Sequence, residues 1–544
     1  MQLKLELVYD ATTILIIQTY KEWVTVTEMI LTDFLDRAVR VYGEKKAIID
    51  QNDRAYTYTE INDRVNQLSH GLSALGIQKG DRVAYLAPNT LEMFEGFYGV
   101  FQVGAIMVSL NTRLKSDDYL YILNHSESKA LFVDHELYDL IAPILPKLET
   151  VQSVVVHGAE RSSGSYFAYD SWLQSQESVP YSRADLSEND LCSILYTSGT
   201  TGKPKGVMLT HRSNYLHALS TMHHLQVSDQ DTLLHVLPMF HVNGWGSPFY
   251  YTANGATQVM QKKTDPSEIL ERMDRYDVSV MHMAPTVLGS LIDQYKAKKC
   301  NITQDVRVVI AGAAPPQAFV KTLEEEIGFT FIQVYGMTES SPLSLISYLS
   351  SEDDDLVGDR YYEAKAKQGF EMIGSKVRVI NDEGKSVPTD GKTVGELVVK
   401  GHGVMKGYWK NDEETARTIR DGWLYTGDMA TVDDRHRVQV VDRKKDIIIS
   451  GGENISSIEV ESVFYDHPSV KEAAIVAKPD EKWGETPHAI LVLREGHQAT
   501  EQEMIDYARS KLAHFKCPRY VTFLEELPKT ASGKIQKVYL RDLV

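Results

Sequence analysis

Two hydrophobic patterns alternate along the first two thirds of the chain. Amphipathic stretches with helical spacing of their apolar residues are separated by short apolar runs that favour strands. The predicted helices are 58–75, 90–103 and 117–124, and the predicted strands are 82–88, 105–110 and 130–134. The same pattern returns at 278–285 and 306–316. Such alternation is typical of parallel α/β layers.

The pattern changes after about residue 369, where the chain becomes rich in β segments with frequent glycine, including 394–401. A second change comes after 442–446, where a compact segment with helix, strand and helix signals runs to the last residue. A chain of 544 residues exceeds what one hydrophobic core usually supports. Two or more domains are therefore expected.

The first 28 residues differ from the rest of the chain. From Met29 onward an amphipathic helix and then a strand are predicted, whereas the preceding pattern is patchy. An extra β segment and a tail added by an upstream start codon both fit this stretch. We favour the tail and predict that residues 1–28 are an N-terminal extension.

Composition excludes several classes of protein. The net charge of −18, with 57 basic and 75 acidic residues, argues against a nucleic-acid partner, since polyanions prefer a clustered basic face. The three cysteines are too scattered for a disulfide framework or a zinc site. No apolar stretch approaches the roughly 20 residues of a membrane span, and the C-terminus is not a peroxisomal signal. These features predict a cytoplasmic enzyme without stable membrane insertion.

The stretch "ILYTSGTTGKPKGVMLTH" at 194–211 has the composition of a phosphate-binding loop. Its hydroxyls and glycines can bring N–H groups close to an anion, and Lys203 and Lys205 add positive charge. It is not a Walker A box, because Pro204 follows the Gly-Lys pair where that motif needs Ser or Thr. An ordinary loop is the alternative, although the two lysines and the preceding strand make the pattern more specific.

Two further motifs carry chemistry in the middle of the chain. In "FIQVYGMTES" at 331–340, Tyr335 offers a flat face for a purine, and Glu339 is a suitable ligand for Mg²⁺. In "GWLYTGDMA" at 422–430, Asp428 comes after an aromatic strand, where a carboxylate can accept both ribose hydroxyls. Taken singly, each acidic residue also fits a simple turn.

Two motifs lie near the C-terminus. "DRKKDIIISGGEN" at 442–454 is a charged cluster between two β-rich blocks, and "LPKTASGKIQK" at 527–537 holds Lys534 between a glycine and an apolar residue. A lysine there is normally a solvated charge, so Lys534 gains meaning only from the other motifs.

The five motifs together, in this order and spacing, resemble the adenylate-forming superfamily of acyl-CoA synthetases, luciferases and peptide-synthetase adenylation domains. The resemblance extends from about residue 29 to the C-terminus. It implies an α/β fold with a large N-terminal domain of layered α/β subdomains plus a β-barrel-like subdomain, and a small mobile α+β C-terminal domain. The implied boundaries are 29–441 for the large domain, 442–446 for a hinge and 447–544 for the small domain.

The resemblance also implies the reaction and its cofactors. A carboxylic acid attacks the α-phosphate of ATP, pyrophosphate leaves, and the thiol of CoA then attacks the acyl-adenylate. Charge that develops on the phosphates needs lysines, hydroxyls and Mg²⁺. Lys534 would bridge the carboxylate and the α-phosphate, Thr338 and Glu339 would be catalytic, and Thr197 and Glu339 would place the metal.

The remaining nucleotide contacts are implied by the same resemblance. Tyr335 would stack on adenine, Asp428 and Arg443 would hold the ribose, and Lys445 would be the pivot of the domain rotation. The other implied contacts are Ser198, Gly199, Thr200, Thr201, Gly202 and Lys205 at the phosphates, Gly312, Ala313, Ala314, Gln333 and Gly336 near the nucleotide, and Gly451 and Gly452 at the CoA tunnel.

The acid is less clearly indicated. "LPMFHVNGWGSPF" at 237–249 resembles the acyl-pocket entrance of fatty-acid CoA ligases, with His241 near the carboxylate and Trp245 as a gate. "KAKQG" at 365–369 also resembles fatty-acyl members. A medium- or long-chain fatty acid is therefore predicted. The same chemistry on a short-chain, aromatic or methylthio-substituted acid is the alternative, and a core role is the alternative for Trp245.

Other functions and sites stay open at this point. A carrier-protein acceptor, a luciferase-type oxygenation and a non-catalytic nucleotide-binding protein are the rival functions, and relatives with this pocket suggest a homodimer. The histidine-rich stretch at 211–224 is more simply a helix than a metal site, because neither Cys nor carboxylate completes it. The acidic run at 352–359 is expected to be a solvated loop.

Overall fold

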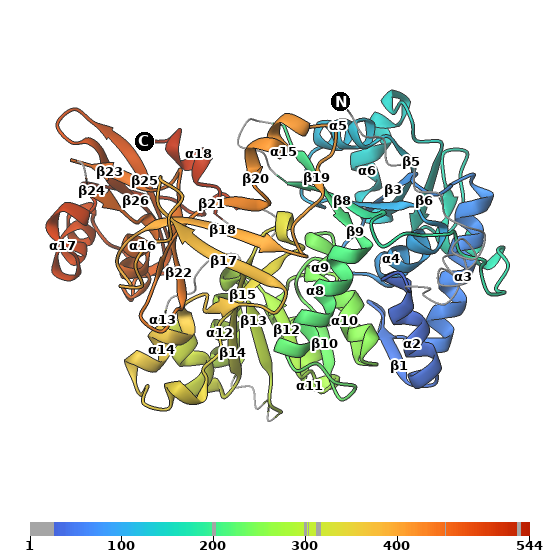
Figure 1. Ribbon diagram of the computed structural model, residues 1–544, viewed down its shortest axis with the longest axis horizontal. Coiled ribbons are helices and arrows are strands. Elements are labelled where there is room, and N and C mark those ends of the chain that lie inside the picture. The colour runs from blue at the N-terminus through green and yellow to red at the C-terminus, as the bar shows by residue number, and fades with distance from the viewer. Residues whose placement is uncertain are drawn as a thin grey trace, which may run out of the picture.

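The computed structural model describes residues 27–197, 203–298, 302, 304–311, 317–451, 453–529 and 535–544. Two large sheets with helices around them form the body of the molecule, and the C-terminal part lies to one side (Figure 1). A smaller antiparallel sheet lies between the body and the C-terminal part (Figure 1). The α/β fold with a large N-terminal and a small C-terminal domain is thus confirmed.

The first large sheet has eight strands in the order β19-β9-β8-β4-β3-β5-β6-β7. Its strands are β3 (Arg82–Leu86), β4 (Ile106–Ser109), β5 (Ser128–Asp134), β6 (Ser153–His157), β7 (Phe167–Ala168), β8 (Leu191–Thr197), β9 (Lys205–Thr210) and β19 (Gly407–Tyr408). Neighbours from β8 to β7 are parallel, whereas β8, β9 and β19 are antiparallel. The phosphate-loop hairpin therefore lies near one edge.

The second large sheet has nine strands in the order β16-β15-β14-β13-β12-β10-β11-β1-β2. Its strands are β1 (Lys46–Ile49), β2 (Ala55–Thr57), β10 (Thr232–His235), β11 (Thr257–Met260), β12 (Val280–Met283), β13 (Arg307–Ile310), β14 (Thr330–Gly336), β15 (Leu343–Ile346) and β16 (Phe370–Glu371). The six central strands from β14 to β1 are parallel. Buried parallel strands need apolar side chains on both faces, as the continuous apolar runs of the sequence predict.

Helices pack between and around these sheets. The structure contains α2 (Thr32–Tyr42), α3 (Tyr58–Ala74), α4 (Leu91–Val103), α5 (Ser116–Ser126), α6 (Tyr138–Ile141), α7 (Tyr169–Gln174), α8 (His211–His224), α9 (Val242–Trp245), α10 (Ser247–Ala253), α11 (Pro266–Arg275), α12 (Pro285–Lys298), α13 (Gln317–Lys321) and α14 (Asp359–Ala366). Short helical turns are η1 (His135–Leu137), η2 (Ala142–Lys147), η3 (Thr322–Ile327), η4 (Thr338–Ser340) and η5 (Ser351–Asp353). Residues of α2, α3, α4, α8 and α10 share one core with both sheets.

Local sequence explains where the best-predicted helices begin and end. Thr57 and Glu60 form a capping box at the start of α3, which satisfies two backbone donors at once. Thr90 caps α4 through its hydroxyl, and Gly104 ends that helix at φ 78°. The predicted helices 58–75, 90–103 and 117–124 are confirmed within a few residues.

The third sheet and the C-terminal sheet have five strands each. The third sheet contains β17 (Ser375–Ile380), β18 (Gly395–Gly401), β20 (Ile419–Arg420), β21 (Trp423–Val432) and β22 (Val438–Arg443). The C-terminal sheet contains β23 (Ile448–Ser450), β24 (Glu453–Ile455), β25 (Val470–Asp480), β26 (Gly484–Leu493) and β27 (Tyr520–Phe523). The accompanying helices are α15 (Asp412–Thr418), α16 (Ser457–Tyr465), α17 (Glu501–Lys511), η6 (His514–Lys516) and α18 (Lys537–Arg541).

The acidic run at 352–359 is mostly exposed, as a solvated loop is expected to be, but Asp353 departs from this prediction. Asp353 is buried in η5, where it pairs with Arg435 at 2.6 Å and with the buried Arg437. Two arginines therefore hold the run to the turn between β21 and β22. A pattern of consecutive acidic residues does not reveal such contacts.

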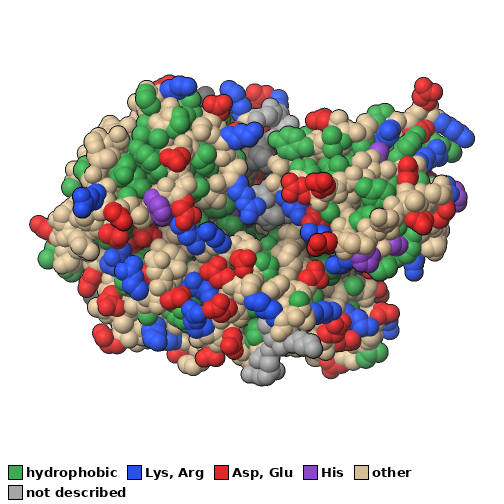
Figure 2. Space-filling view, turned by 180° about the vertical axis from the view of Figure 1, so that it is seen from behind, with side chains coloured by type: hydrophobic (Ala, Val, Ile, Leu, Met, Phe, Trp, Pro, Cys, Tyr) green, Lys and Arg blue, Asp and Glu red, His purple; other side chains and the backbone are tan. Residues whose placement is uncertain are grey.

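The surface is electrically mixed. Acidic and basic side chains are interspersed over the face seen in Figure 2, and no continuous basic area covers it. In the described part of the chain, no helix is long and apolar enough to cross a membrane. The prediction that residues 1–28 are an extension falls almost wholly outside the described residues.

Candidate active site

The phosphate-loop motif joins two antiparallel strands. β8 ends at Thr197, which lies opposite Lys205 at the start of β9. This register holds both ends of the loop in one place, because hairpin partners are fixed by their ladder hydrogen bonds. The predicted contacts Ser198, Gly199, Thr200, Thr201 and Gly202 lie outside the described residues.

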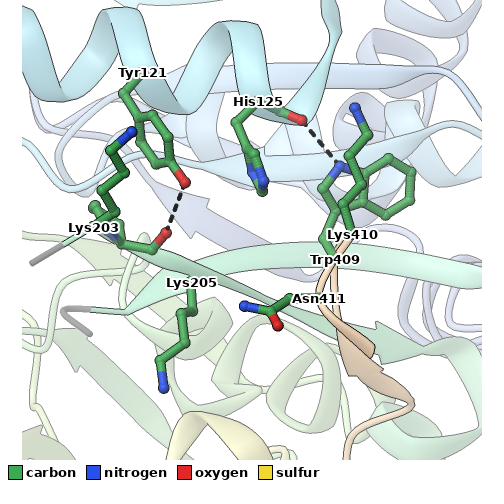
Figure 3. Close-up of a pocket in the computed structure, with 8 residues that line it drawn as sticks. Tyr121, His125, Lys203, Lys205, Trp409, Lys410 and Asn411 are labelled. Carbon is green, nitrogen blue, oxygen red and sulfur yellow. Dashed lines mark hydrogen bonds between the residues drawn. The ribbon is translucent and has the colours of Figure 1, made fainter. Parts of the chain in front are cut away.

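The two lysines of this motif point toward different aromatic rings. Lys203 points to the ring of Tyr121 at 5.3 Å, whereas the ammonium of Lys205 lies over the ring of Tyr408 at 4.9 Å. Figure 3 shows Lys203 beside Tyr121 and Lys205 directed away from it. A cavity of about 220 Å³ lies on the Lys203 side and is lined by Tyr121, His125, Lys203, Pro204, Lys205, Trp409, Lys410 and Asn411.

Tyr335 and Arg443 both contact the carboxylate of Asp428, and all three residues are predicted to bind adenosine. The Tyr335 hydroxyl, on β14, donates to Oδ2 of Asp428 at 2.5 Å. Nε of Arg443, at the end of β22, lies 2.6 Å from Oδ1 of Asp428, and the two residues are direct partners of β21 and β22. A carboxylate has about four acceptor positions. Asp428 therefore keeps acceptor capacity for ribose hydroxyls.

Burial and charge fix the protonation states of Tyr335 and Arg443. Burial and the nearby Asp428 raise the pKa of Tyr335 well above its ordinary value, so its hydroxyl stays a donor. Burial lowers the pKa of Arg443, but the negative charge of Asp428 outweighs this effect and the pKa ends above its ordinary value. The part of the site predicted to bind adenosine thus contains a fixed phenol, a carboxylate and a guanidinium.

Gln333 and Gly336 flank Tyr335 on the same strand. Gln333 is 2% exposed, and within the described chain its Oε1 has no hydrogen-bond partner. A buried amide oxygen without a donor is unfavourable, and a ligand N–H would satisfy it. A Cβ on Gly336 would lie 1.9 Å from the carbonyl oxygen of Pro342, so only glycine fits the close approach of this turn.

Thr338 and Glu339 belong to η4, which directly follows β14, and both are buried. Oε1 of Glu339 accepts a hydrogen bond from the Tyr408 hydroxyl at 2.9 Å. Within the described residues, no lysine, arginine or histidine forms a salt bridge with Glu339. The charge of Glu339 acts on the nearby Arg443, but a buried carboxylate without a direct ion pair among these residues has the chemistry that suits a hard divalent cation.

Thr197 lies in the same neighbourhood as Glu339. It faces Lys205 across the hairpin, Lys205 covers the ring of Tyr408, and Tyr408 bonds Glu339. The residues predicted to place Mg²⁺ are thus connected through these two intermediate side chains, and their oxygen donors fit that ion.

The predicted hinge begins at the end of β22. The Lys445 carbonyl accepts a hydrogen bond at 3.2 Å from Arg541 on α18, and Arg541 also pairs with Asp446. Gly451 follows β23 at φ 62°, and a Cβ there would lie 2.8 Å from the indole of Trp483. Glycine is required at this position for both reasons. Gly452 lies outside the described residues.

The predicted acyl-pocket segment contains a left-handed turn. His241 precedes Val242, Asn243, Gly244, Trp245 and Gly246, and these five residues have φ between 48° and 75°. Trp245 is 5% exposed and stacks on the ring of His282, with centroids 5.9 Å apart. His282 is buried, and its Nε2 lies 3.2 Å from the Tyr251 hydroxyl.

Burial lowers the pKa of His282 to about 3, with smaller effects from His235 and Arg307. This imidazole is therefore neutral at physiological pH. Its stacking partner Trp245 consequently meets an aromatic surface rather than a charge.

The histidine-rich stretch forms α8, as predicted. His217 is buried within this helix, and His224 accepts a hydrogen bond at 3.0 Å from the backbone of Ile373. Among the described residues, no group of three or more His, Cys, Asp or Glu side chains is arranged to hold a metal ion.

Several predicted site residues cannot be placed, and several neighbours were not predicted. Lys534, Gly312, Ala313 and Ala314 lie outside the described residues. Tyr408, His282 and Trp483 contact predicted site residues, but no sequence motif marks them. Each is distant along the chain from its partner, so a local pattern carries no signal of the contact.

Comparisons with known proteins match both parts of the chain. The model of the AMP-binding enzyme family matches residues 35–409, and that of the AMP-binding enzyme C-terminal domain matches residues 459–534. A 2-methylpropanoate–CoA ligase of Humulus lupulus is 38% identical over 526 residues, which cover 94% of each chain. A peroxisomal benzoate–CoA ligase of Arabidopsis thaliana is 38% identical over 536 residues, covering 94% of this chain and 92% of its own.

The solved structures give the same result. An anthranilate–CoA ligase in complex with anthranoyl-AMP has a TM-score of 0.88 and 28% identity, covering 95% of this chain and 97% of its own. The family matches extend over most of the chain, and the motifs occur in the order of the adenylate-forming superfamily. The chain therefore belongs to the AMP-binding enzyme family, as an adenylate-forming acid–CoA ligase that uses ATP, Mg²⁺ and CoA.

Proposed function

We propose that this protein is an AMP-forming CoA ligase for a short-chain or aromatic carboxylic acid. In the first step a carboxylate oxygen forms a bond to the α-phosphorus of ATP, and the bond to pyrophosphate breaks. In the second step the sulfur of CoA forms a bond to the acyl carbon, the thiol proton is released, and AMP leaves. The two half-reactions give acyl-CoA, AMP and pyrophosphate.

The residues of the site are assigned to the first step by their chemistry. Tyr335, Asp428 and Arg443 bind and orient adenosine, with Asp428 accepting from the ribose. Glu339 and Thr197 would hold Mg²⁺, which would neutralise charge on the phosphates. Lys534 bridges the attacking carboxylate and the α-phosphate, as the motif predicts.

The second step requires a site for CoA beside the hinge. Trp483 packs on Gly451, and Lys482 and Arg519 place cations over its ring at 4.7 and 5.4 Å. A flat aromatic surface with two cations suits a phosphorylated nucleotide such as that of CoA. This arrangement supports thioester formation as the second half of the reaction.

The fixed position of Trp245 is the observation that carries the choice of acid. Left-handed backbone costs roughly 1–2 kcal/mol per non-glycine residue, so the turn at 242–246 persists only because its surroundings hold it. Nδ2 of Asn243, which is fully buried, donates to Oγ of Ser193 on β8 at 3.1 Å. A tryptophan that is held in this way and stacked on His282 is better suited to form a fixed wall of the acyl pocket than to move as its gate.

A fixed wall favours a small or compact acid over a long chain. The three similar ligases act, by their names, on 2-methylpropanoate, benzoate and anthranilate, which are all compact acids. The "KAKQG" segment, which supported a fatty acid, makes structural contacts. Lys367 pairs with Asp433 at 3.0 Å, and Gln368 accepts from the backbone of Val440 at 2.6 Å.

The deciding experiment measures pyrophosphate release with ATP, Mg²⁺ and CoA across a panel of acids. The panel extends from acetate to palmitate and includes benzoate, cinnamate and 3-methylthiopropionate. A maximum among the short or aromatic acids is expected, and a maximum at eight or more carbons would return the assignment to fatty acids.

A variant tests the role of Trp245 in the same assay. Trp245→Ala is expected to raise the rate with octanoate relative to butyrate by roughly tenfold, since the binding differences of small apolar groups are of that order. An unchanged ratio in a folded variant would mean that Trp245 is only a core residue.

The same assay separates the rival functions. A protein that forms no AMP with any acid would be a non-catalytic nucleotide binder. A protein that releases pyrophosphate but forms no CoA thioester would transfer the acyl group elsewhere. The cytoplasmic location and the homodimer stay predictions, and the benzoate–CoA ligase of Arabidopsis is named as peroxisomal.

A further inference from the structure

Tyr408 lies between Glu339, the metal-binding carboxylate of the proposed function, and Lys205, a predicted phosphate contact. Its hydroxyl donates to Oε1 of Glu339 at 2.9 Å, and its ring lies below the ammonium of Lys205 at 4.9 Å. Nζ of Lys205 also pairs with Oε1 of Glu414 on α15 at 2.7 Å. One aromatic side chain thus contacts both the metal-binding carboxylate and the lysine of the phosphate loop.

The backbone around Tyr408 is fixed from two sides. β19 pairs with β9, so that Tyr408 lies opposite Val207, and the Trp409 N–H donates to the Gly206 carbonyl at 2.7 Å. On the other side, the Met405 N–H donates to the Glu339 carbonyl at 2.8 Å. The segment 405–409, which contains β19, therefore joins the phosphate-loop hairpin to η4 through main-chain hydrogen bonds.

The side chain of Tyr408 has little freedom. The residue is 4% exposed, and its backbone N–H donates to Oγ1 of Thr415 at 2.9 Å. A fixed phenol can hold a carboxylate in one orientation without losing further rotamer freedom on ligand binding.

The hydrogen bond between Tyr408 and Glu339 joins a phenol donor to a carboxylate oxygen. A hydrogen bond from a neutral donor to a carboxylate is among the stronger ones in proteins.

We propose that Tyr408 is a positioning residue for the Mg·ATP complex. It holds Oε1 of Glu339 so that the other oxygen, Oε2, is left for the divalent cation, and it places Lys205 at the end of the phosphate loop. This inference rests on the proposed function, because it assigns a role toward ATP and its metal ion. Tyr408 itself touches neither reacting atom.

The conservative variant Tyr408→Phe removes one hydroxyl and keeps the ring below Lys205. Binding is measured with α,β-methylene-ATP, once as its Mn²⁺ complex by electron paramagnetic resonance and once metal-free by equilibrium dialysis. Affinity for the Mn²⁺ complex is expected to fall roughly tenfold, the order expected when a carboxylate loses a hydrogen bond. Affinity for the metal-free analogue is expected to stay within about twofold.

Tyr119→Phe is the matched control. Its hydroxyl donates to the Asn111 carbonyl at 2.8 Å, so the same kind of group is removed from a bond of similar length away from the site. The control is expected to leave both affinities unchanged. Equal behaviour of the two variants would overturn the role of Tyr408.

A double variant tests whether Tyr408 acts through Glu339. In a Glu339→Gln background, Tyr408→Phe is expected to lower affinity for the Mn²⁺ complex by less than about twofold, because the coupled group is already altered. A full tenfold loss there would reject the coupling. These binding results do not depend on the acid, so wild-type protein that releases no pyrophosphate would refute the proposed function alone.

Discussion

At the scale of single residues, the site depends on groups whose partners fix their charge and direction. Asp428 accepts from Tyr335 and pairs with Arg443, so its position is set before any ribose arrives. Glu339 is oriented by one phenol. Preorganised donors and acceptors of this kind are effective because they need no rearrangement during the reaction.

The assignment of Lys534 yields a prediction at this scale. Lys534→Ala is expected to slow adenylate formation from acid and ATP by roughly 10²–10³, the usual effect of removing one electrostatic group from a transition state. Thioester formation from a supplied acyl-adenylate should be largely spared. Pyrophosphate release and thioester formation are measured separately, and an equal loss in both would remove the proposed role.

At the scale of elements, η5 is held to the third sheet by charge. Asp353 pairs with Arg435 and with Arg437, whose side chain is 4% exposed. Burial raises the pKa of Asp353, but the hydrogen bonds from the two arginines outweigh it and hold the pKa well below the ordinary 3.8. The ionised form is therefore favoured by folding.

Replacement of Asp353 gives a pH-dependent stability prediction. Because the folded pKa is depressed, the ion pair contributes stability at pH above the unfolded pKa of about 4 and loses it as the pH falls further. Asp353→Asn is expected to lower the free energy of unfolding by roughly 3 kcal/mol at pH 7, since Arg437 is left without its charge partner. The difference from wild type should shrink below about pH 4.

Denaturant unfolding at several pH values measures this difference. The exposed neighbour Asp354 supplies the control, because Asp354→Asn removes the same charge from the same segment without breaking a described ion pair. If the free energy of unfolding of Asp353→Asn is lower than that of wild type by the same amount at pH 7 and pH 3, the loss of stability does not come from the ion pair.

At the scale of the whole molecule, residues 442–446 connect the large domain to the small one. They contact α16 and α18 of the small domain. Asp442 accepts from the backbone N–H of Ser457 at 2.6 Å, and Arg541 pairs with Asp446. Arg494 lies 3.6 Å from Asp293 on α12, which is an exposed contact between the domains. We propose 442–446 as the hinge, since it has partners in both domains: Arg443 pairs with Asp428 of the large domain, and Asp446 pairs with Arg541 of the small one.

A hinge at Lys445 predicts a selective kinetic effect. Proline there fixes φ and restricts the preceding residue, so domain rotation is hindered. Lys445→Pro is expected to slow thioester formation by roughly tenfold, about 1.4 kcal/mol of barrier, and to leave adenylate formation nearly unchanged. Lys445→Ala, which keeps backbone rotation, should resemble wild type, and a loss confined to adenylation would place the hinge elsewhere.

Local sequence predicted much of this architecture correctly. The helices 58–75 and 90–103 correspond to α3 and α4, because apolar periodicity and capping residues act over a few positions. The buried Asp353 was not predicted, because its arginine partners come more than 80 residues later in the chain. The fatty-acid preference was drawn from segments that the fold uses partly for structural contacts.

The sequence by itself determined the family chemistry and the order of its motifs: the phosphate loop, the Tyr335 and Asp428 motifs, and the segments predicted to hold the hinge and Lys534. Motif spacing and turn residues are local properties, so they can be read without the fold. Only the tertiary structure decided which side chains meet, as Tyr335 does with Asp428 93 residues later and Tyr408 with Glu339 69 residues earlier. Such contacts depend on strand order and register, which are set by burial across the whole molecule.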